Sequence, residues 1–286
     1  MGLFNKKEKE PKLPKYRTSK INTRVLNYQT YYFSKKELIL YVALLFIAGG
    51  IVGLIFYANL FMDDDRPTLA TYISNVVIFG LFGGLAIKYF LPMRKKSLFE
   101  KQRSELSLQF REFLSSLSTS FSSGENVSTA FTNAYTDLTA QYGEHSFIST
   151  ELFVIVSGMN NNVTLNELLD DFAERSGIDD IVNFVNVFKT CYRAGGDMKK
   201  VVRNTYDLIG EKIAITEEIR TKITSNNMQQ NVMSIMPIVI IAFLRFSSSQ
   251  FASNFASPLG VVMMTVAVAI FLGAYIYGRK IIDIKL

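Results

Sequence analysis

The fold of this chain is decided by residues 38–62, which read LILYVALLFIAGGIVGLIFYANLFM. This stretch contains no Asp, Glu, Lys, Arg or His. Coiled as a helix, it is long enough to cross the roughly 30 Å hydrocarbon layer of a bilayer. It therefore predicts a transmembrane helix.

Three further stretches predict spans of the same kind, at residues 68–91, 227–246 and 259–278. The first carries one charge, Lys88, near its end, where a long side chain can reach the interface. The second is apolar from residue 232 to 244, contains Pro237, and is long enough if its polar ends lie at headgroup depth. The third is uncharged over its whole length. The four spans form two predicted hairpins, at residues 38–92 and 231–280.

The flanking charges predict the orientation of these spans. Basic residues precede the first span at 35–36, follow the second at 94–96 and follow the fourth at 279–280. The tip of the first hairpin is acidic at 63–65, and the second tip, 247–258, is uncharged. Lys and Arg are retained on the cytoplasmic side, so both termini and the segment between the hairpins are expected in the cytoplasm, with the chain in the cell (inner) membrane. No small-residue cleavage site accompanies the first span, which is not expected to be a removable signal peptide.

The average composition conceals how the charges are distributed. The 286 residues are 49% hydrophobic and carry a formal net charge of +6. Residues 1–37 hold ten Lys and Arg against three Glu, so the basic surplus lies largely in this tail. We expect the tail to lie near anionic lipid headgroups, where each cation contributes about 1 kcal/mol. Nucleic-acid binding is disfavoured, because the tail's aromatic residues are not arranged as a stacking platform.

Residues 93–230 are predicted to form a soluble helical bundle between the hairpins. Apolar side chains recur there with helical period, and glycine-containing or small polar turns separate the helices. Thr164 and Glu167 fit a capping box. The expected helices cover residues 106–121, 127–138, 148–157, 164–176, 181–191 and 198–223. The predicted fold class is therefore all-α: a polytopic membrane protein with four transmembrane helices in two hairpins flanking a cytoplasmic bundle of about six helices, plus a short cytoplasmic C-terminus at 281–286.

The middle of the bundle is strongly acidic. Between residues 125 and 180 there are ten Asp and Glu against one base, Arg175. A solvated polar face explains this pattern simply, whereas a docking surface for a basic partner is the sharper interpretation.

Candidate chemical sites are few. One Cys and one His exclude an internal disulfide and any Cys-based or multi-histidine metal site. Gly195–Gly196 lacks the spacing of a phosphate-binding loop, His145 lies in a polar stretch typical of an exposed loop, and Cys191 is expected to be a small buried hydrophobe. The acidic triplet at 63–65 better fits a solvated hairpin tip than a cation site. We expect no catalytic residue, cofactor or metal, and the spans lack the mid-membrane ionisable groups of a coupled transporter.

Small residues four apart in the spans allow close approach of helix backbones. The contacts could lie within the chain, which we favour, or between subunits. The candidate packing residues are Gly49, Gly53, Gly80, Gly84, Ala274 and Gly278.

The order hairpin, helical module, hairpin and three sequence stretches together resemble the type II secretion system F-domain family. These stretches read FREFLSSLSTSFSSGENVSTAF (110–131), NVTLNELLDDFAERSG (162–177) and FKTCYRAGGDMKKVVRNTYDLIGEKIAITEEI (188–219). The family contains inner-membrane platform proteins of type II secretion, type IV pili and archaeal flagella. A single module between two hairpins is most similar to the tight-adherence pilus proteins TadB and TadC, over about residues 97–280.

The resemblance implies a non-enzymatic platform. Its implied partners are a cytoplasmic secretion ATPase, pilin-like subunits, and a second F-domain protein or a second copy of this chain. Our hypothesis places part of the ATPase-docking face at Glu125, Glu167, Asp170, Asp171 and Glu174. The alternative is a membrane-anchored scaffold or signalling protein with another cytoplasmic partner.

Overall fold

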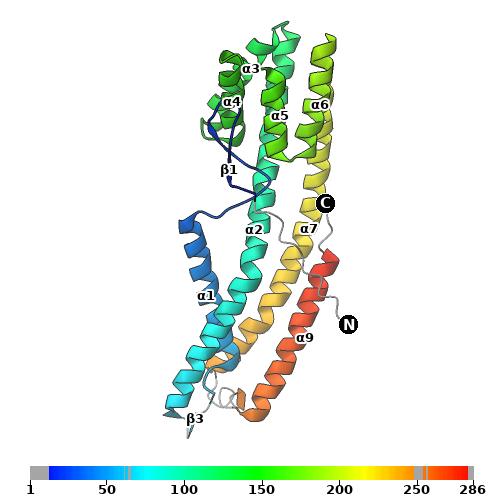
Figure 1. Cartoon of the computed structure of the whole chain (residues 1–286). Helices are drawn as coiled ribbons and strands as arrows, with labels where there is room; N and C mark the ends of the chain where they lie inside the picture. Colours follow the sequence, from blue (N-terminus) through cyan, green and yellow to red (C-terminus); the bar gives the residue numbers. More distant parts are fainter. Residues whose placement is uncertain (1–12, 61, 64–65, 248–253, 256, 283–286) are drawn as a thin grey trace, which may run out of the picture. The chain divides into compact units, whose positions relative to one another are not determined.

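The computed structural model describes residues 13–60, 62–63, 66–247, 254–255 and 257–282. These residues are mostly helical, which confirms the predicted helical class (Figure 1). The helices are α1 (Lys35–Tyr57), α2 (Leu69–Ser122), α3 (Val127–Tyr142), α4 (Phe147–Asn160), α5 (Leu165–Ser176), α6 (Asp179–Ala194), α7 (Met198–Ser247) and α9 (Pro258–Ile282).

Two short antiparallel strand pairs, which the sequence did not predict, accompany the helices. Strand β1 (Tyr16–Thr18) pairs with β2 (Arg24–Leu26), and β3 (Met62–Asp63) pairs with β4 (Arg66–Pro67). The first pair lies in the segment that the sequence analysis treated as a simple basic tail.

The chain forms two compact units, which we call the helical unit and the apolar unit. The helical unit contains the described residues 13–32 and Lys95–Ala214, and the apolar unit contains Phe33–Arg94 and the described part of 215–286. Helices α2 and α7 each contribute residues to both units. The second span and first bundle helix were predicted separately, as were the sixth bundle helix and third span, but each pair is one helix with an internal proline, Pro92 in α2 and Pro237 in α7.

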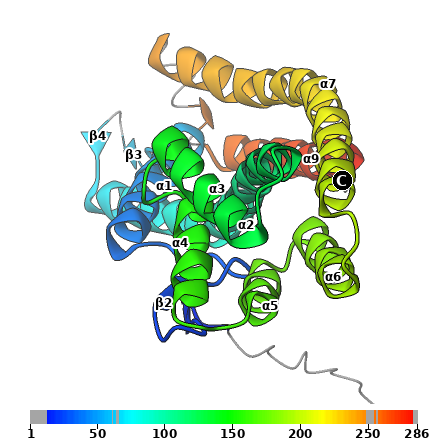
Figure 2. The same ribbon diagram turned by 90° about the horizontal axis from the view of Figure 1, so that it is seen from above.

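In the helical unit, α3 to α6 are arranged beside the C-terminal part of α2 (Figures 1 and 2). Most of the apolar positions whose helical spacing predicts the inner faces of α2 and α3 are buried, namely Leu106, Phe110, Phe113, Leu114, Leu117, Ala130, Phe131, Ala134 and Leu138. Phe121, Val127 and Tyr135, which the same spacing includes, are only half-buried against this core. The ring centroids of Phe113 and Phe131 lie 5.4 Å apart, as do those of Phe110 and Phe184. These contacts hold α3 and α6 on one apolar face of α2.

The predicted helix ends are mostly confirmed. Gly177 and Gly195 end α5 and α6 with φ of +58° and +67°, the left-handed region that glycine adopts without strain. Thr164 is the N-cap of α5, but the predicted capping box does not form, because its side chain makes no capping hydrogen bond. The backbone N–H of Glu167 instead donates to the carbonyl oxygen of Thr164 at 3.1 Å.

Cys191 is half-buried rather than buried, which corrects the prediction made from its apolar neighbours. It lies in the last turn of α6, where the chain turns through two glycines that carry no side chain to cover it. A Cβ atom placed on Gly196 would lie 2.7 Å from the Cys191 sulfur, so a side chain at this position would require the thiol to move.

In the apolar unit, α1 and the apolar part of α2 are long and apolar enough to cross a membrane. Their large apolar side chains point outward, with Ile39 69% exposed and Val76 73% exposed. Contiguous exposed apolar surface of this kind is unusual on a soluble protein and supports a membrane location. Shorter apolar stretches lie at Asn231–Ser247 in α7 and Pro258–Phe271 in α9.

Helices α1, α7 and α9 meet at one end of the apolar unit. The Arg245 guanidinium of α7 donates to the carbonyl oxygens of Ile55, at 2.9 Å, and of Ala58. These carbonyls belong to the C-terminal end of α1, where a cation is favourable. The Tyr57 hydroxyl also lies 3.2 Å from the Thr265 hydroxyl of α9.

Candidate partner-docking site

Five of the ten acidic residues between 125 and 180 form ion pairs within the chain. Two of them pair with lysines on other helices: Asp170 with Lys189, at 2.6 Å from Oδ1 to Nζ, and Asp180 with Lys212, at 2.8 Å. The other three, Glu151, Asp171 and Glu174, pair with arginines. The acidic stretch is therefore only partly a free surface.

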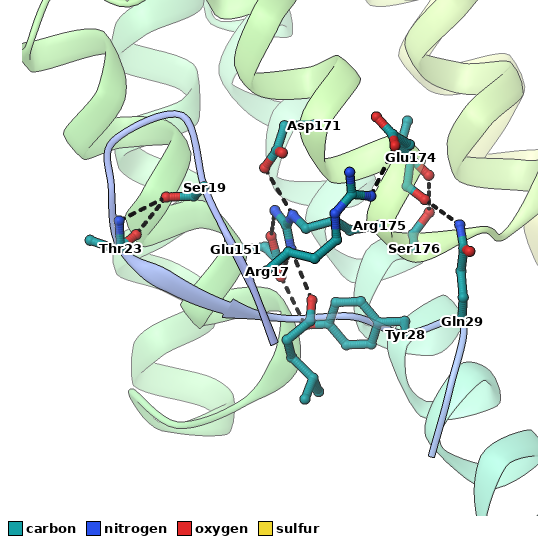
Figure 3. A network of polar contacts seen from close by, with 12 residues as sticks. Arg17, Ser19, Thr23, Tyr28, Gln29, Glu151, Asp171, Glu174, Arg175 and Ser176 are labelled. Atoms are coloured by element: carbon teal, nitrogen blue, oxygen red, sulfur yellow. Dashed lines mark hydrogen bonds and ion pairs between the residues drawn. The ribbon is translucent and has the colours of Figure 1, made fainter. Parts of the chain in front are cut away.

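A buried ionic network accounts for two of these acids (Figure 3). Arg175 donates from Nη1 and Nη2 to the two carboxylate oxygens of Glu151, at 2.8 and 2.6 Å, and from Nε to Asp171 at 2.8 Å. The side chains of Arg175 and Glu151 are only 1% and 0% exposed. The Tyr28 hydroxyl donates to the same carboxylate at 3.0 Å. This fork-to-fork geometry satisfies both buried charges.

The network shifts the protonation of its members. Burial by itself lowers the pKa of the Arg175 guanidinium, but hydrogen bonds and charges from Glu151 and Asp171 outweigh it, and the pKa is raised above its ordinary value. Burial, followed by the negative charge of Glu151, raises the pKa of the Tyr28 phenol well above its ordinary value. Arg175 stays charged and Tyr28 stays a hydrogen-bond donor throughout the physiological pH range.

The same network attaches the N-terminal segment, residues 13–32, to α4 and α5. The Tyr28 N–H donates to the Arg175 carbonyl at 3.0 Å, and Arg175 Nη1 donates to the Leu26 carbonyl at 3.2 Å. Gln29 Nε2 donates to the Glu174 carbonyl at 2.6 Å, and Arg17 pairs with the Glu174 carboxylate at 2.9 Å. The described part of the basic tail thus packs on protein, and its predicted contact with anionic lipid headgroups stays a prediction.

This network was not predicted from the sequence, although two signals for it are present. Glu151 is a lone acid among apolar positions, three residues after Ile148 and four before Ile155, so helical periodicity places it on the buried face. Arg175 is the single base of the acidic stretch. A buried acid needs a partner, and this base was the available one.

The five proposed docking residues therefore fall into two groups, those paired within the chain and those without an ion pair. Asp171 belongs to the buried network, and Asp170 and Glu174 are held in ion pairs at the surface. Glu167 is exposed in the first turn of α5, and Glu125 lies at the turn between α2 and α3. Glu125 and Glu167 are the two members without an ion pair among the described residues.

Glu125 lines a polar pocket formed by the end of α2 and the facing side of α3. The pocket has a volume of about 290 Å³. Asn133 Nδ2 donates to Glu125 at 2.7 Å, and the Ser116 hydroxyl donates to Asp137 at 2.7 Å. The lining residues are Ser116, Thr119, Ser120, Ser123, Glu125, Asn133, Thr136 and Asp137.

Comparison with protein families, curated proteins and solved structures found no match. The candidate function therefore depends on the residues and geometry of this chain and on the resemblance noted above.

Only some of the small residues proposed for helix packing lie in a close contact between helices. A Cβ atom on Gly49 would lie 2.5 Å from Ala86 Cβ, and one on Gly53 would lie 2.7 Å from Phe82 Cβ, so both glycines sit where α1 meets α2. Gly80 and Gly84 have nothing within 4 Å of that position and do not make this contact. Gly50 and Gly83, which were not proposed, lie at the interface against Phe79 and Phe46.

The remaining candidates from the sequence add no chemistry. Ala274 is exposed on α9, and the surroundings of Gly278 lie outside the described residues, as do Asp64 and Asp65. His145 is exposed in the turn before α4, as expected. Within the described ranges, no group of three His, Cys, Asp or Glu side chains is placed to hold a metal ion.

Proposed function

We propose that this chain is a multi-pass platform protein of the cell membrane, which couples a cytoplasmic secretion ATPase to the extraction and assembly of pilin-like subunits. The observation that carries the proposal is the division of the chain into one unit with outward-facing apolar helices and one well-packed helical unit. A platform needs an anchor in lipid and a rigid module on which partners act.

The contacts within the apolar unit favour four spans rather than two. Large apolar side chains on α7 and α9, such as Ile240, Phe243, Val262 and Ile270, are exposed like those of α1 and α2. The Arg245 contacts bring the end of α7 to the end of α1. This arrangement suits two antiparallel hairpins whose tips lie on the same side of the membrane.

The acidic residues of the helical unit support a binding role. Ion pairs neutralise five of the ten acidic residues between 125 and 180, and of the five proposed docking residues Glu125 and Glu167 remain for an electrostatic contact with a basic partner. The family resemblance supplies the identity of that partner, a hexameric secretion ATPase, together with the pilin-like subunits and a second platform subunit.

The proposal is tested by purifying the tagged chain from native membranes after mild crosslinking and identifying its partners by mass spectrometry. We expect a secretion ATPase and pilin-like subunits, and we expect deletion of the gene to remove surface filaments in electron micrographs. A tagged membrane protein of similar topology controls for nonspecific capture. Partners of another class, together with unchanged filaments in the deletion strain, would instead favour the anchored scaffold or signalling protein.

A further inference from the structure

The β1–β2 hairpin of the N-terminal segment has two faces with different surroundings. Side chains alternate between the two faces of a strand, so the paired residues Arg17 and Val25 share one face. This is the face that packs on the helices, because Val25 is buried and Arg17 pairs with a carboxylate of α5. Tyr16, Thr18 and Arg24 share the opposite face and are exposed. The hairpin therefore packs on protein through one face only and leaves an outer face uncovered.

The outer face is basic and aromatic. The Arg24 guanidinium lies over the Tyr16 ring, 4.2 Å from its centre, and the Lys15 ammonium lies 5.5 Å from the same centre. Lys20, in the turn of the β1–β2 hairpin, is also exposed. None of the three cations forms an ion pair with a residue that the structure describes. Uncompensated cations around an exposed tyrosine favour a contact with anionic groups.

A chain of contacts connects this outer face to the point at which α2 leaves its apolar stretch. The Tyr32 hydroxyl donates to the Leu13 carbonyl at 2.7 Å, which brings the two ends of the segment together. The Lys95 ammonium of α2 lies 5.3 Å from the centre of the Tyr32 ring. Lys95 follows Leu91, the last residue of the predicted span, by only four residues of the same helix, or about 6 Å. With α2 across a bilayer, Lys95 falls within the headgroup layer, which is about 5–8 Å thick on each side.

The segment also leads directly into the other N-terminal apolar helix. Helix α1 begins at Lys35, three residues after Tyr32. Both chain segments that enter the first predicted hairpin thus meet at this tyrosine. Leu13, two residues before Lys15, has an exposed apolar side chain. Tyrosine rings and apolar side chains beside lysines are typical of the membrane interface.

We propose that the outer face of the β1–β2 hairpin, together with Lys95, binds anionic phospholipid headgroups at the cytoplasmic surface of the membrane. The cations attract the lipid phosphates, and the exposed side chains of Leu13 and Tyr16 enter the interface. An acidic protein partner would match the charge but would not explain the position beside the predicted spans. The residues of this headgroup patch are Leu13, Lys15, Tyr16, Lys20, Arg24 and Lys95.

This inference goes beyond the proposed function and uses only its membrane location. It restricts the lipid contact expected of the whole basic tail to one face of a folded hairpin, and it adds a cation from α2. Failure to copurify a secretion ATPase would leave the headgroup patch standing, and loss of lipid binding at the patch would leave the platform standing, so the two can fail separately.

The experiment measures which lipid lies next to the patch in the full chain. Thr18→Cys, on the outer face, carries a fluorophore in a Cys191→Ser background. The chain is placed in nanodiscs of phosphatidylcholine and anionic phosphatidylglycerol, and either lipid carries a spin label near the top of one acyl chain. Quenching by each labelled lipid reports its concentration beside the probe. Ser123→Cys, about 40 Å along α2 from Lys95, is the distance control.

Two charge variants separate the patch from the overall charge of the helical unit. Lys20→Gln with Arg24→Gln removes two charges of the patch and leaves the buried face of the β1–β2 hairpin unchanged. Lys199→Gln with Lys200→Gln removes two exposed charges at the start of α7, about 45 Å along that helix from its apolar stretch at Asn231–Ser247. The second variant is the matched control.

We expect labelled phosphatidylglycerol to quench the Thr18→Cys probe more strongly than labelled phosphatidylcholine in the wild-type background and in the matched control. The patch variant should reduce this preference about fivefold or more. Neither lipid should quench the Ser123→Cys probe.

Three outcomes would overturn the proposal. The first is equal quenching by the two labelled lipids in the wild-type background. The second is a preference that falls equally in the patch variant and the matched control, which would indicate a diffuse field. The third is no quenching of the Thr18→Cys probe by either lipid, which would favour an acidic protein partner instead.

Discussion

At the scale of single residues, Arg175 joins three parts of the helical unit. Its guanidinium is buried and donates hydrogen bonds to the carboxylates of Glu151 and Asp171 and to the Leu26 carbonyl of the N-terminal segment. Removing one partner of such a pair leaves an uncompensated buried charge, which costs more than the pair itself contributes. The arginine thus links α4, α5 and the N-terminal segment into one packed body.

Replacing Arg175 with Met should lower the free energy of unfolding of the helical unit by about 3–5 kcal/mol, because Glu151 loses its buried counter-ion. The matched control is Arg203→Met, which removes a surface pair with Asp207 whose partners are 63% and 52% exposed. The control should change stability by less than about 1 kcal/mol. Hydrogen exchange of α4 and α5 in the detergent-solubilised chain measures the loss of stability in both variants. An equal loss in Arg175→Met and Arg203→Met would show that the buried pair has no special role.

The Tyr28 phenol predicts a specific sensitivity to alkaline pH. Its folded-state pKa is raised by burial and by Glu151, so the folded state holds the proton more tightly than the unfolded state does. The resulting stability is fully present below the ordinary tyrosine pKa of about 10 and is lost as pH rises through the folded-state value.

We therefore expect the thermal midpoint of the full chain to fall above about pH 10, and the Tyr28→Phe variant to lose less over the same interval. Tyr135→Phe serves as the control, since the Tyr135 ring contacts Phe153 outside the network. An identical alkaline decline in wild type and Tyr28→Phe would contradict the assignment.

At the scale of elements, the two N-terminal apolar helices pack through glycines that the spacing pattern identified only in part. Gly49 and Gly53 lie against Ala86 and Phe82 of α2, whereas Gly80 on α2 faces open space. The spacing rule finds positions where close approach is possible, and the rotation of each helix about its axis decides which are used.

Gly49→Ala should loosen the α1–α2 pair at a cost of about 1–3 kcal/mol, because its new methyl would overlap Ala86 and the Phe82 carbonyl. Gly80→Ala should be neutral within the apolar unit, since nothing lies within 4 Å of the added carbon. The thermal midpoint of the purified chain in detergent compares the variants. Equal thermal midpoints for Gly49→Ala and Gly80→Ala would contradict the close contact between Gly49 and Ala86.

At the scale of the whole molecule, the proposed four-span topology predicts which residues face each side of the membrane. In a Cys191→Ser background, Asp64→Cys and Ser248→Cys should be labelled by an impermeant maleimide from outside intact cells. Glu144→Cys, exposed in the turn before α4, should be labelled only after permeabilisation. The positive flanks at 35–36, 94–96 and 279–280 are the physical reason. Labelling of Glu144→Cys in intact cells would invert the orientation.

Helical periodicity was sufficient to predict most of the helical unit. The apolar positions of α2 and α3, and the glycine ends of α5 and α6, follow from local spacing and backbone conformation, which depend on near neighbours. The continuity of α2 through Pro92 did not follow, because a proline favours a break locally and surrounding helix can override it. The continuity of α7 across residues 223–227 did not follow either, because the bundle helix and the apolar span were predicted from separate apolar patterns.

The sequence by itself determined the helical class, the apolar segments, the bundle core and the acidic character of residues 125–180. Only the tertiary structure decided which acids are free, because that depends on pairs such as Arg17 with Glu174 and Lys212 with Asp180, whose members lie far apart in the chain. It also decided that Tyr28 is buried on Glu151 and that Glu125 and Asp137 share one pocket. Hydrophobic periodicity can be read within a single helix, whereas an ion pair depends on how two elements that are distant in the sequence pack together.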